Sequence, residues 1–236
     1  MKIALIGYGK MGQTIEKLAL REGHEIVLKI NRERIDDLTV ENLRAADVAI
    51  EFSTPQTVIK NILLCFEAGT PVIIGTTSWN AYKKEIEETC ISVGGSMLAA
   101  SNFSLGVNLF FAINSKLAQM MAKYHQYKVS VSEIHHTAKL DAPSGTAITL
   151  AEQIIEEIPR KTKWVKENSN DSSDLTIHSE RIDPAPGTHH VKYSSDIDDI
   201  EIMHKAHNRQ GFALGAVVAA EFLKGKKGVY NMSNII

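Results

Sequence analysis

The first twelve residues constrain the fold more than any other part of the chain. Lys2–Ile6 is a short apolar run that predicts a β-strand, and the turn Gly7-Tyr8-Gly9-Lys10-Met11-Gly12 follows it directly. A helical pattern then runs from Gln13 to Glu22. In this context G-x-G-x-x-G predicts a dinucleotide site, because its glycines permit a tight turn, approach of a pyrophosphate and close helix packing. A glycine-rich turn without a ligand is the alternative.

Strand and helix patterns alternate after this turn. The predicted strands are Glu25–Ile30, Val48–Phe52, Val72–Ile74 and Met97–Ala100, and the predicted helices between them are Pro55–Ala68 and Trp79–Cys90. Such alternation is typical of a parallel doubly wound sheet. Ligands bind such sheets beyond the carboxyl ends of the strands.

Three small polar loops follow predicted strands and are therefore candidates for contacts with a nicotinamide or ribose. They are Phe52-Ser53-Thr54-Pro55, Gly75-Thr76-Thr77 and Ala100-Ser101-Asn102-Phe103. Each could offer backbone and side-chain hydrogen bonds. Ser, Thr and Asn are also common in plain turns and helix caps, which is the alternative interpretation of each loop.

The end of the second predicted strand bears on the choice of cofactor. A carboxylate is expected there to bind the adenosine ribose, but the chain has Asn31, followed by Arg32, Glu33 and Arg34. Without that carboxylate a 2′-phosphate is not repelled, and Arg32 or Arg34 could pair with it. The pattern favours NADPH over NADH; two solvated surface arginines are the alternative.

The second half of the chain has a different pattern. A helix is predicted from about Leu105 to Tyr124, a strand with one buried face over Tyr127–Ile134, and a helix over Ser144–Ile158. Lys161–Asp174 is polar and predicts a loop. Three further strands and a closing helix follow, at Leu175–Ile182, His189–Ser195, Ile200–Lys205 and Gly211–Lys224.

The small residues of the closing helix suit close packing, and we expect it to return to the first domain. The predicted fold is therefore α/β. A Rossmann-type doubly wound domain is formed by residues 1–103 and 208–236. A mixed α/β domain, residues 104–207, is inserted into it and is expected to bind the substrate.

The segment between the strand at Tyr127–Ile134 and the helix at Ser144–Ile158 carries the chemistry. His135 and His136 offer imidazoles that exchange protons near neutral pH, and Lys139 offers a cation. Asp141 stands at a good capping position before Pro143-Ser144. Gly145 and Thr146 in the first helical turn could present N–H groups to a carboxylate. Taken singly, these residues could be structural histidines, a surface lysine and an ordinary cap.

A metal site is the rival interpretation of the nine histidines. Zinc needs three or four converging ligands, and adjacent histidines in a strand point to opposite faces. No H-x-x-x-H or H-E-x-x-H pairing occurs. We therefore expect no metal.

Composition excludes other classes of protein. The formal net charge of −2 gives no basic surface for nucleic acid, and no apolar run reaches the roughly 18 residues that a membrane span needs. Cys65 and Cys90 fall in helical patterns, as buried thiols in a reducing compartment would. These features indicate a cytoplasmic protein.

The glycine turn combined with Glu133-Ile134-His135-His136-x-x-Lys139-x-Asp141-Ala142-Pro143-Ser144-Gly145-Thr146-Ala147 closely resembles the dihydrodipicolinate reductases, enzymes of diaminopimelate and lysine synthesis. The resemblance continues through Gly187-Thr188-His189, His204-Lys205-Ala206 and Arg209-x-x-Phe212. It implies reduction of a cyclic imine dicarboxylate by NADPH or NADH. It also implies a homotetramer built by the inserted sheet.

The resemblance further implies residue roles. His135 would be the proton donor and acceptor, Lys139 a second proton donor, and His136 with the Gly145 and Thr146 amides the carboxylate site. The implied cofactor residues are Gly7, Tyr8, Gly9, Lys10, Met11, Gly12, Gly75, Thr76, Thr77, Ala99, Ala100, Ser101 and Asn102. Glu51 departs from the family, whose members usually have aspartate before Phe52. The rival functions are another NAD(P)-dependent oxidoreductase of amino-acid metabolism and a non-catalytic nucleotide sensor.

Overall fold

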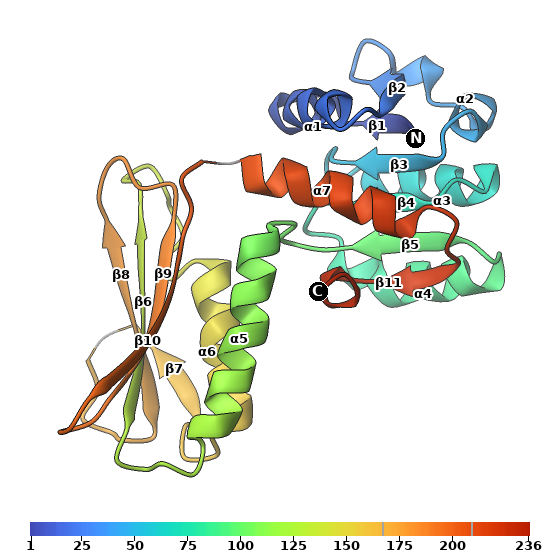
Figure 1. Cartoon of the computed structure of the whole chain (residues 1–236). Coiled ribbons are helices and arrows are strands. Elements are labelled where there is room, and N and C mark those ends of the chain that lie inside the picture. The colour runs from blue at the N-terminus through green and yellow to red at the C-terminus, as the bar shows by residue number, and fades with distance from the viewer. Residues whose placement is uncertain (167, 209) are drawn as a thin grey trace. The chain divides into compact units, whose positions relative to one another are not determined.

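The chain folds into two compact units. The computed structural model describes residues 1–166, 168–208 and 210–236. One unit comprises Met1–Leu105 and Gln210–Ile236, and the other comprises Gly106–Arg209. Figure 1 shows a sheet with helices in each unit. Among the described residues, no helix has the length and apolar character that crossing a membrane requires.

The first unit is built on a six-stranded sheet in the order β11-β5-β4-β3-β1-β2, in which every neighbouring pair is parallel. The strands are β1 (Lys2–Ile6), β2 (Glu25–Ile30), β3 (Val48–Glu51), β4 (Val72–Ile74), β5 (Ser96–Ala99) and β11 (Gly228–Tyr230). This confirms the predicted parallel sheet. The three-residue strand β11 extends it at the edge, beside β5.

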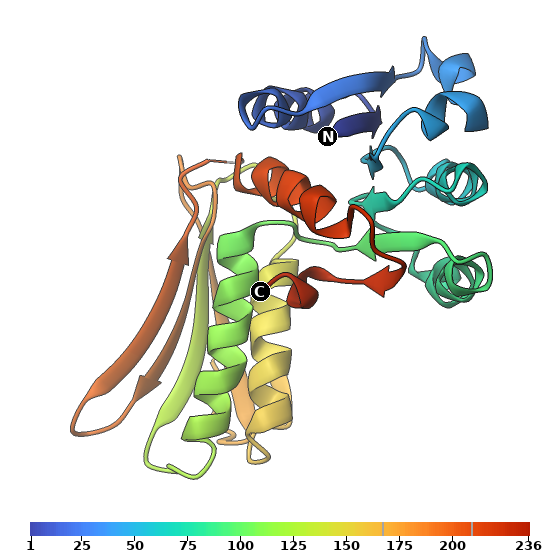
Figure 2. The same ribbon diagram turned by 45° about the vertical axis from the view of Figure 1, so that its right-hand side comes forward.

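Helices cover both faces of this sheet, as a doubly wound fold requires (Figure 2). Alternate residues of β1 enter different cores: Ile3 and Leu5 pack with α1 (Lys10–Arg21) and α7 (Gln210–Leu223). Ala4 and Ile6 pack in the core on the opposite face. The helices that contribute to that core are α2 (Val40–Arg44), α3 (Val58–Ala68) and α4 (Lys83–Ser92).

Helix α7 packs closely against the segment that follows β5. A Cβ atom on Gly215 would lie 1.6 Å from the Phe103 carbonyl oxygen, so only glycine fits there. The neighbouring residues of α7, Ala213 and Ala216, are fully buried. The return of the closing helix to the first unit is therefore confirmed.

The second unit holds a five-stranded mixed sheet in the order β10-β9-β6-β8-β7. Its strands are β6 (Lys128–His135), β7 (Lys163–Val165), β8 (Asp174–Arg181), β9 (Thr188–Ser194) and β10 (Asp199–Lys205). Burial alternates strictly along β6, which places Val129, Val131, Glu133 and His135 on the covered face. Helices α5 (Leu105–Met121) and α6 (Gly145–Glu157) pack side by side over that face (Figure 2).

Several predicted boundaries are wrong. The segment Lys161–Asp174, predicted as a loop, contains β7, whose three residues pair with β8 and are too few to show a periodic pattern. Helices α1 and α3 begin at Lys10 and Val58 instead of Gln13 and Pro55. The predicted helix at Trp79 is a 3-10 turn over Asn80–Tyr82 followed by α4.

Candidate active site

The glycine turn after β1 has the shape that a dinucleotide needs. Gly7 has φ +97°, and a Cβ atom there would lie 2.0 Å from the Phe52 carbonyl oxygen. A Cβ atom on Gly12 would lie 2.4 Å from the Gly7 carbonyl oxygen. Both glycines are thus required by close backbone contacts within the protein.

Gly9 differs from its neighbours, because a Cβ atom on it would meet nothing within 4 Å. It is the N-cap of α1, where no side chain caps the helix and no acidic residue occupies the first turn. The first N–H groups of α1 have no intrahelical acceptor and lie at the positive end of the helix dipole, which suits a pyrophosphate.

The three residues between the glycines of this turn differ in their contacts and exposure. Tyr8 donates a hydrogen bond to Glu16 of α1, whose second carboxylate oxygen lies 2.9 Å from the Lys29 Nζ of β2. Lys10 is exposed and Met11 is half-buried. The Tyr8 side chain is thus linked to α1 and, through Glu16, to β2.

The structure of the segment after β2 distinguishes Arg32 from Arg34, either of which the sequence allowed as the partner of a 2′-phosphate. The Asn31 side-chain oxygen accepts hydrogen bonds from the backbone N–H groups of Glu33 and Arg34. Arg34 Nε lies 2.7 Å from an Asp37 carboxylate oxygen, so this guanidinium is already paired. Arg32 is exposed, and in the described part of the chain no ion pair engages it. Of the two cations, Arg32 is the one available to a ligand.

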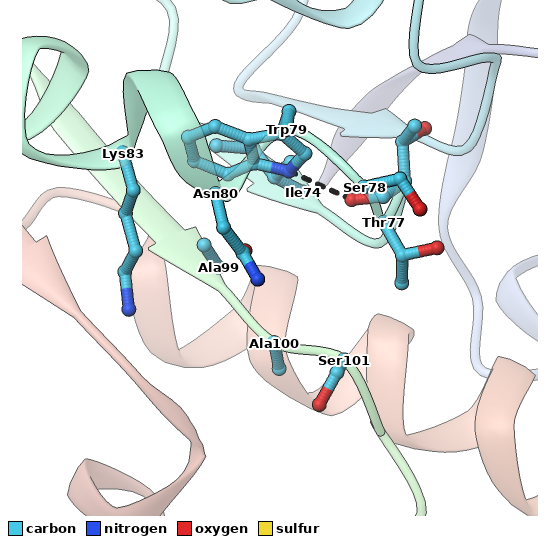
Figure 3. Close-up of a pocket in the computed structure, with 10 residues that line it drawn as sticks. Ile74, Thr77, Ser78, Trp79, Asn80, Lys83, Ala99, Ala100 and Ser101 are labelled. Atoms are coloured by element: carbon cyan, nitrogen blue, oxygen red, sulfur yellow. Dashed lines mark hydrogen bonds between the residues drawn. The ribbon is translucent and has the colours of Figure 1, made fainter. Parts of the chain in front are cut away.

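A pocket of about 280 Å³ lies at the carboxyl ends of β4 and β5 (Figure 3). Five of its lining residues are among the predicted cofactor residues: Thr76, Thr77, Ala99, Ala100 and Ser101. Sequence analysis did not single out Trp79, Asn80 and Lys83, which also line it. The Trp79 indole donates to the Thr76 carbonyl at 2.8 Å and so holds the loop after β4. Predicted residues Gly75 and Asn102 adjoin this lining along the chain.

Beneath these loops, Glu51 forms a buried polar network at the end of β3. Its Oε1 accepts hydrogen bonds from the Ser53 hydroxyl and from Asn61 Nδ2, while Oε2 has no hydrogen-bond partner among the described residues. The Ser53 N–H donates to the Thr76 hydroxyl at 2.8 Å. Burial raises the pKa of Glu51, while the neighbouring polar groups of Ser53, Thr76 and Asn61 have the opposing effect. This network ties two of the candidate cofactor loops together.

In the second unit, the predicted proton-transfer residues are His135, the last residue of β6, and Lys139, in the loop before α6. Ser144, not Asp141, is the N-cap of α6, because its Oγ accepts from the Ala147 N–H at 3.3 Å. The expectation that Asp141 caps the helix is therefore wrong. Gly145 is exposed and Thr146 is half-exposed, and both lie in the first turn, where N–H groups have no intrahelical acceptor.

Asp141 instead pairs with Lys139. Both carboxylate oxygens of Asp141 accept from Lys139 Nζ, at 2.7 and 2.8 Å. This hydrogen bonding holds the pKa of Asp141 below its usual range. His136 is half-exposed at the start of the same loop, and its carbonyl accepts from the Lys139 N–H. Any carboxylate that binds Lys139 must share its ammonium group with Asp141 or displace the Asp141 carboxylate.

His135 lies at the buried end of β6, with 7% of its surface exposed. Its ring meets the His189 ring edge-on, with centroids 5.0 Å apart. Burial lowers the pKa of His135 to about 4, although the nearby Glu133 carboxylate opposes that shift. The sequence predicts an imidazole that titrates near neutrality, whereas burial leaves the His135 imidazole neutral at pH 7.

Glu133 and His189 are the main residues of this site that sequence analysis did not assign. Glu133 is 1% exposed, and both of its oxygens accept from the Ser144 N–H, at 3.0 and 3.1 Å. Burial alone would raise the pKa of Glu133, but interactions with His189, Ser144 and Ser179 hold it well below its usual range. His189 comes from β9, directly opposite Glu133 in the antiparallel pairing with β6.

The same residues answer the question of a metal site. Among the residues that the structure describes, ligand atoms of Glu133, His135 and His189 converge within 4.8 Å. However, Arg181 Nη2 lies 3.3 Å from Glu133 Oε1 and already balances the carboxylate charge. N–H and O–H donors also engage the Glu133 oxygens. These contacts fit a hydrogen-bonded cluster better than a metal centre.

Comparisons with known proteins agree with the resemblance seen in the sequence. Residues 1–103 and 106–236 match models of the N-terminus and the C-terminus of dihydrodipicolinate reductase. The chain is 48% identical to the 4-hydroxy-tetrahydrodipicolinate reductase of Christiangramia forsetii, over 100% of this chain and 98% of that protein. It is 34% identical to the Neisseria meningitidis protein of the same name, over 94% and 83%.

Solved structures share the fold. Dipicolinate-bound dihydrodipicolinate reductase from Paenisporosarcina sp. TG-14 matches with a TM-score of 0.80 at 24% identity, over 100% of this chain and 99% of that one. An amine dehydrogenase from Mycobacterium smegmatis matches with a TM-score of 0.61 at 10% identity, over 97% and 94%. With both family models matched along nearly its whole length, this chain belongs to the dihydrodipicolinate reductase family.

Proposed function

We propose that this chain reduces 4-hydroxy-tetrahydrodipicolinate to tetrahydrodipicolinate with a nicotinamide cofactor, in the synthesis of diaminopimelate and lysine. The observation that carries the proposal is the placement of His135 and Lys139 on the strand end and the loop that lead into α6, whose Gly145 and Thr146 N–H groups have no intrahelical acceptor. Relatives at 48%, 34% and 32% identity bear the corresponding name, which supports it.

The substrate of this reaction is a cyclic dicarboxylate, and the second unit offers matching groups. The Gly145 and Thr146 N–H groups would bind one carboxylate, with His136 at its side. A carboxylate at a helix N-terminus gains about 0.3–1 kcal/mol from the helix dipole, and more when it is partly buried. The dipicolinate bound by the Paenisporosarcina enzyme has the same two-carboxylate chemistry and supports this assignment.

The chain's own residues would complete the reaction by proton transfer. The 4-hydroxyl group leaves the substrate as water; the nicotinamide, when bound, would supply a hydride to the dehydrated ring, and the electron-rich ring that results must take up a proton. Lys139 carries protons on Nζ, 2.7 Å from Asp141. His135 is neutral before substrate binds, but a nearby dianion favours the protonated imidazole and would raise its pKa. Both groups can therefore donate a proton once the substrate is present.

The first unit would hold the cofactor. Gly7 through Gly12 would bind the pyrophosphate, with the Gly9 backbone left open for its approach. Residues 75–77 and 99–102 would contact the nicotinamide and its ribose, around the pocket in Figure 3. Glu51, Ser53 and Trp79 would keep those loops in place through the hydrogen bonds described above.

For cofactor preference we propose NADPH over NADH, with Arg32 binding the 2′-phosphate. Arg32→Ala should weaken NADPH binding about tenfold or more and change NADH binding little, because a charge-assisted hydrogen bond contributes roughly 1.5–3 kcal/mol. Arg34→Ala is the matched control, since Arg34 is paired with Asp37. Titration of both cofactors by fluorescence measures the effect. Equal losses of affinity for NADPH and NADH would show that Arg32 does not bind the 2′-phosphate.

We further propose that the protein works in the cytoplasm as a homotetramer that assembles through the second unit. The buried thiols Cys65 and Cys90 suit a reducing compartment. Helices α5 and α6 cover one face of the mixed sheet, and its other face would be available for association. Light scattering coupled to size exclusion should give four times the chain mass of 26.1 kDa; a monomer would contradict the assembly.

The activity itself is tested by following NADPH and NADH absorbance with freshly generated substrate. The substrate is supplied in the assay as the freshly generated product of the preceding synthase. The proposal predicts cofactor oxidation that depends on both the synthase and this chain. A folded protein that binds NADPH yet consumes neither cofactor would instead support the nucleotide-sensor hypothesis.

A further inference from the structure

We propose that Glu133 is a positioning residue that sets the proton affinity of His135 and holds the substrate-binding segments in register, with Arg181 as its cationic partner. The proposal rests on the function proposed above. Glu133 has no assigned role in that reaction, and its carboxylate is too deeply buried to contact the substrate. Its influence must act through the residues that surround it.

The first of these contacts fixes the start of α6. Both Glu133 oxygens accept the Ser144 N–H, at 3.0 and 3.1 Å. A buried carboxylate therefore occupies the first N–H of the helix terminus. The next two N–H groups, those of Gly145 and Thr146, are left for the substrate. Moving Glu133 would shift the anion-binding turn relative to β6.

The second contact links Glu133, through Arg181 of β8, to the loop that carries Lys139 and Asp141. Arg181 Nη2 lies 3.3 Å from Glu133 Oε1 and also donates to the Asp141 carbonyl. Arg181 Nε donates to the Lys139 carbonyl at 3.4 Å. One guanidinium thus joins the buried carboxylate to the backbone of both residues of the Lys139–Asp141 pair.

The third contact concerns the imidazoles. Glu133 Oε2 lies 3.4 Å from His135 Nδ1 and 3.7 Å from His189 Nε2. His189 Nε2 is also 3.1 Å from the Ser144 hydroxyl. The charged and titratable groups that face His135 are Glu133 on its own strand, Arg181 on β8, His189 on β9 and Lys139 on the following loop. Glu133 is the only one of these four that favours a protonated His135.

These contacts have a combined consequence for catalysis. A single negative charge supports the cationic form of His135 and aligns the two segments that would bind substrate carboxylate. A merely structural carboxylate would instead affect folding stability and leave the pH dependence of turnover unchanged. The two roles are therefore separable by experiment.

The test uses the full-length enzyme with Glu133→Gln, which keeps the shape and an acceptor for Ser144 but removes the charge. Turnover should fall roughly 10- to 100-fold, as small misplacements of reacting groups do. The limb of the kcat–pH profile that His135→Asn abolishes should move to lower pH, because the charge that favours the imidazolium is gone. NADPH affinity should not change, since Glu133 lies in the second unit and the first unit is the one proposed to hold the cofactor.

Two further variants sharpen the test. Glu180→Gln removes an exposed carboxylate nearby on β8 and should match the wild type in turnover and pH profile. Arg181→Lys keeps the positive charge but loses the fork that spans Glu133 and the lysine loop. It should lower turnover and dipicolinate affinity about tenfold without moving the pH limb. If Glu133→Gln does not fold, Arg181→Lys still tests whether the link between Glu133 and the Lys139 loop supports turnover.

Failure of the inference is distinct from failure of the proposed function. A wild type that oxidises no cofactor would refute the function. An active wild type with a Glu133→Gln profile superimposable on its own, and unchanged turnover, would refute the positioning role. Normal turnover and dipicolinate affinity in Arg181→Lys would show that Arg181 has no part in the positioning.

Discussion

Burial determines the charge of the histidine at the end of β6. Imidazole titrates near neutrality in water, but His135 is 7% exposed and its pKa falls to about 4. The ring is therefore neutral at pH 7. In the proposed reaction, the negative charge of a bound substrate would favour the protonated ring and would couple proton supply to substrate binding.

A stability measurement tests this residue-scale claim. The folded pKa of about 4 lies below the ordinary value of 6.5. The stabilising contribution of neutral His135 is therefore present above pH 6.5 and is lost as the pH falls through 6.5 toward 4. Relative to His135→Asn, the wild type should lose up to about 3 kcal/mol of unfolding free energy across this window. Urea denaturation at pH 7, 6 and 5 measures most of it.

The control is His178→Asn, which removes an exposed imidazole from the neighbouring strand β8. If the difference between the wild type and His135→Asn were the same at pH 7 and pH 5, burial would not govern this histidine.

At the same scale, the sequence predicted which residues lie between the end of β6 and the start of α6 but not which residues they contact. His135, Lys139 and Gly145 were identifiable because they adjoin one another between a strand and a helix. Glu133 and His189 were not connected, because their contact depends on the antiparallel register of β6 and β9, which no local pattern specifies. Asp141 was taken for a cap because its preference for that position is local, whereas its bond to Lys139 depends on the loop's path.

At the scale of elements, the turn from β1 to α1 contains glycines that the fold requires and one glycine that the fold does not require but that cofactor binding would. Gly7 and Gly12 are required by the protein's own backbone, whereas Gly9 faces open space. Helices and strands with long patterns were predicted, and β1, β2 and β4 have the predicted bounds. The three-residue strands β7 and β11 and the five-residue α2 were missed. Strand β4 is equally short but is wholly apolar and buried, whereas β7 and β11 are partly exposed edge strands without an apolar run.

The matched variants Gly9→Ala and Gly7→Ala test this difference. Gly9→Ala should keep the thermal midpoint close to that of the wild type and weaken NADPH and NADH alike by about tenfold or more, because its methyl group would enter the pyrophosphate site. Gly7→Ala should destabilise the fold by several kcal/mol, since its φ is +97° and its Cβ would lie 2.0 Å from a carbonyl oxygen. Calorimetry and cofactor titration measure both effects. Undiminished cofactor binding by Gly9→Ala would contradict the assigned turn.

At the scale of the whole molecule, each unit has its own core and its own proposed ligand. The two tryptophans of the chain fall in different units, Trp79 in the cofactor unit and Trp164 in the other. The Trp164→Phe variant therefore reports on the first unit, and Trp79→Phe reports on the second. Ligands stabilise the unit that binds them.

Urea unfolding followed by the remaining tryptophan should separate the two ligands. NADPH should raise the midpoint reported by Trp79 more than that reported by Trp164, and dipicolinate should have the opposite effect. The Trp79→Phe variant needs a check of its cofactor affinity, because Trp79 holds Thr76. If dipicolinate raised the midpoint reported by Trp79 more than the midpoint reported by Trp164, the assignment of ligands to the two units would be contradicted.

The most direct measurement of the central claim is NADPH oxidation with freshly generated 4-hydroxy-tetrahydrodipicolinate, compared between the wild type and Lys139→Ala, with NADPH affinity measured in parallel. We expect rapid oxidation by the wild type. In Lys139→Ala we expect a loss of at least about 100-fold, the scale of general acid catalysis, with NADPH affinity unchanged. Full turnover in Lys139→Ala, or a loss explained by weaker NADPH binding, would contradict it.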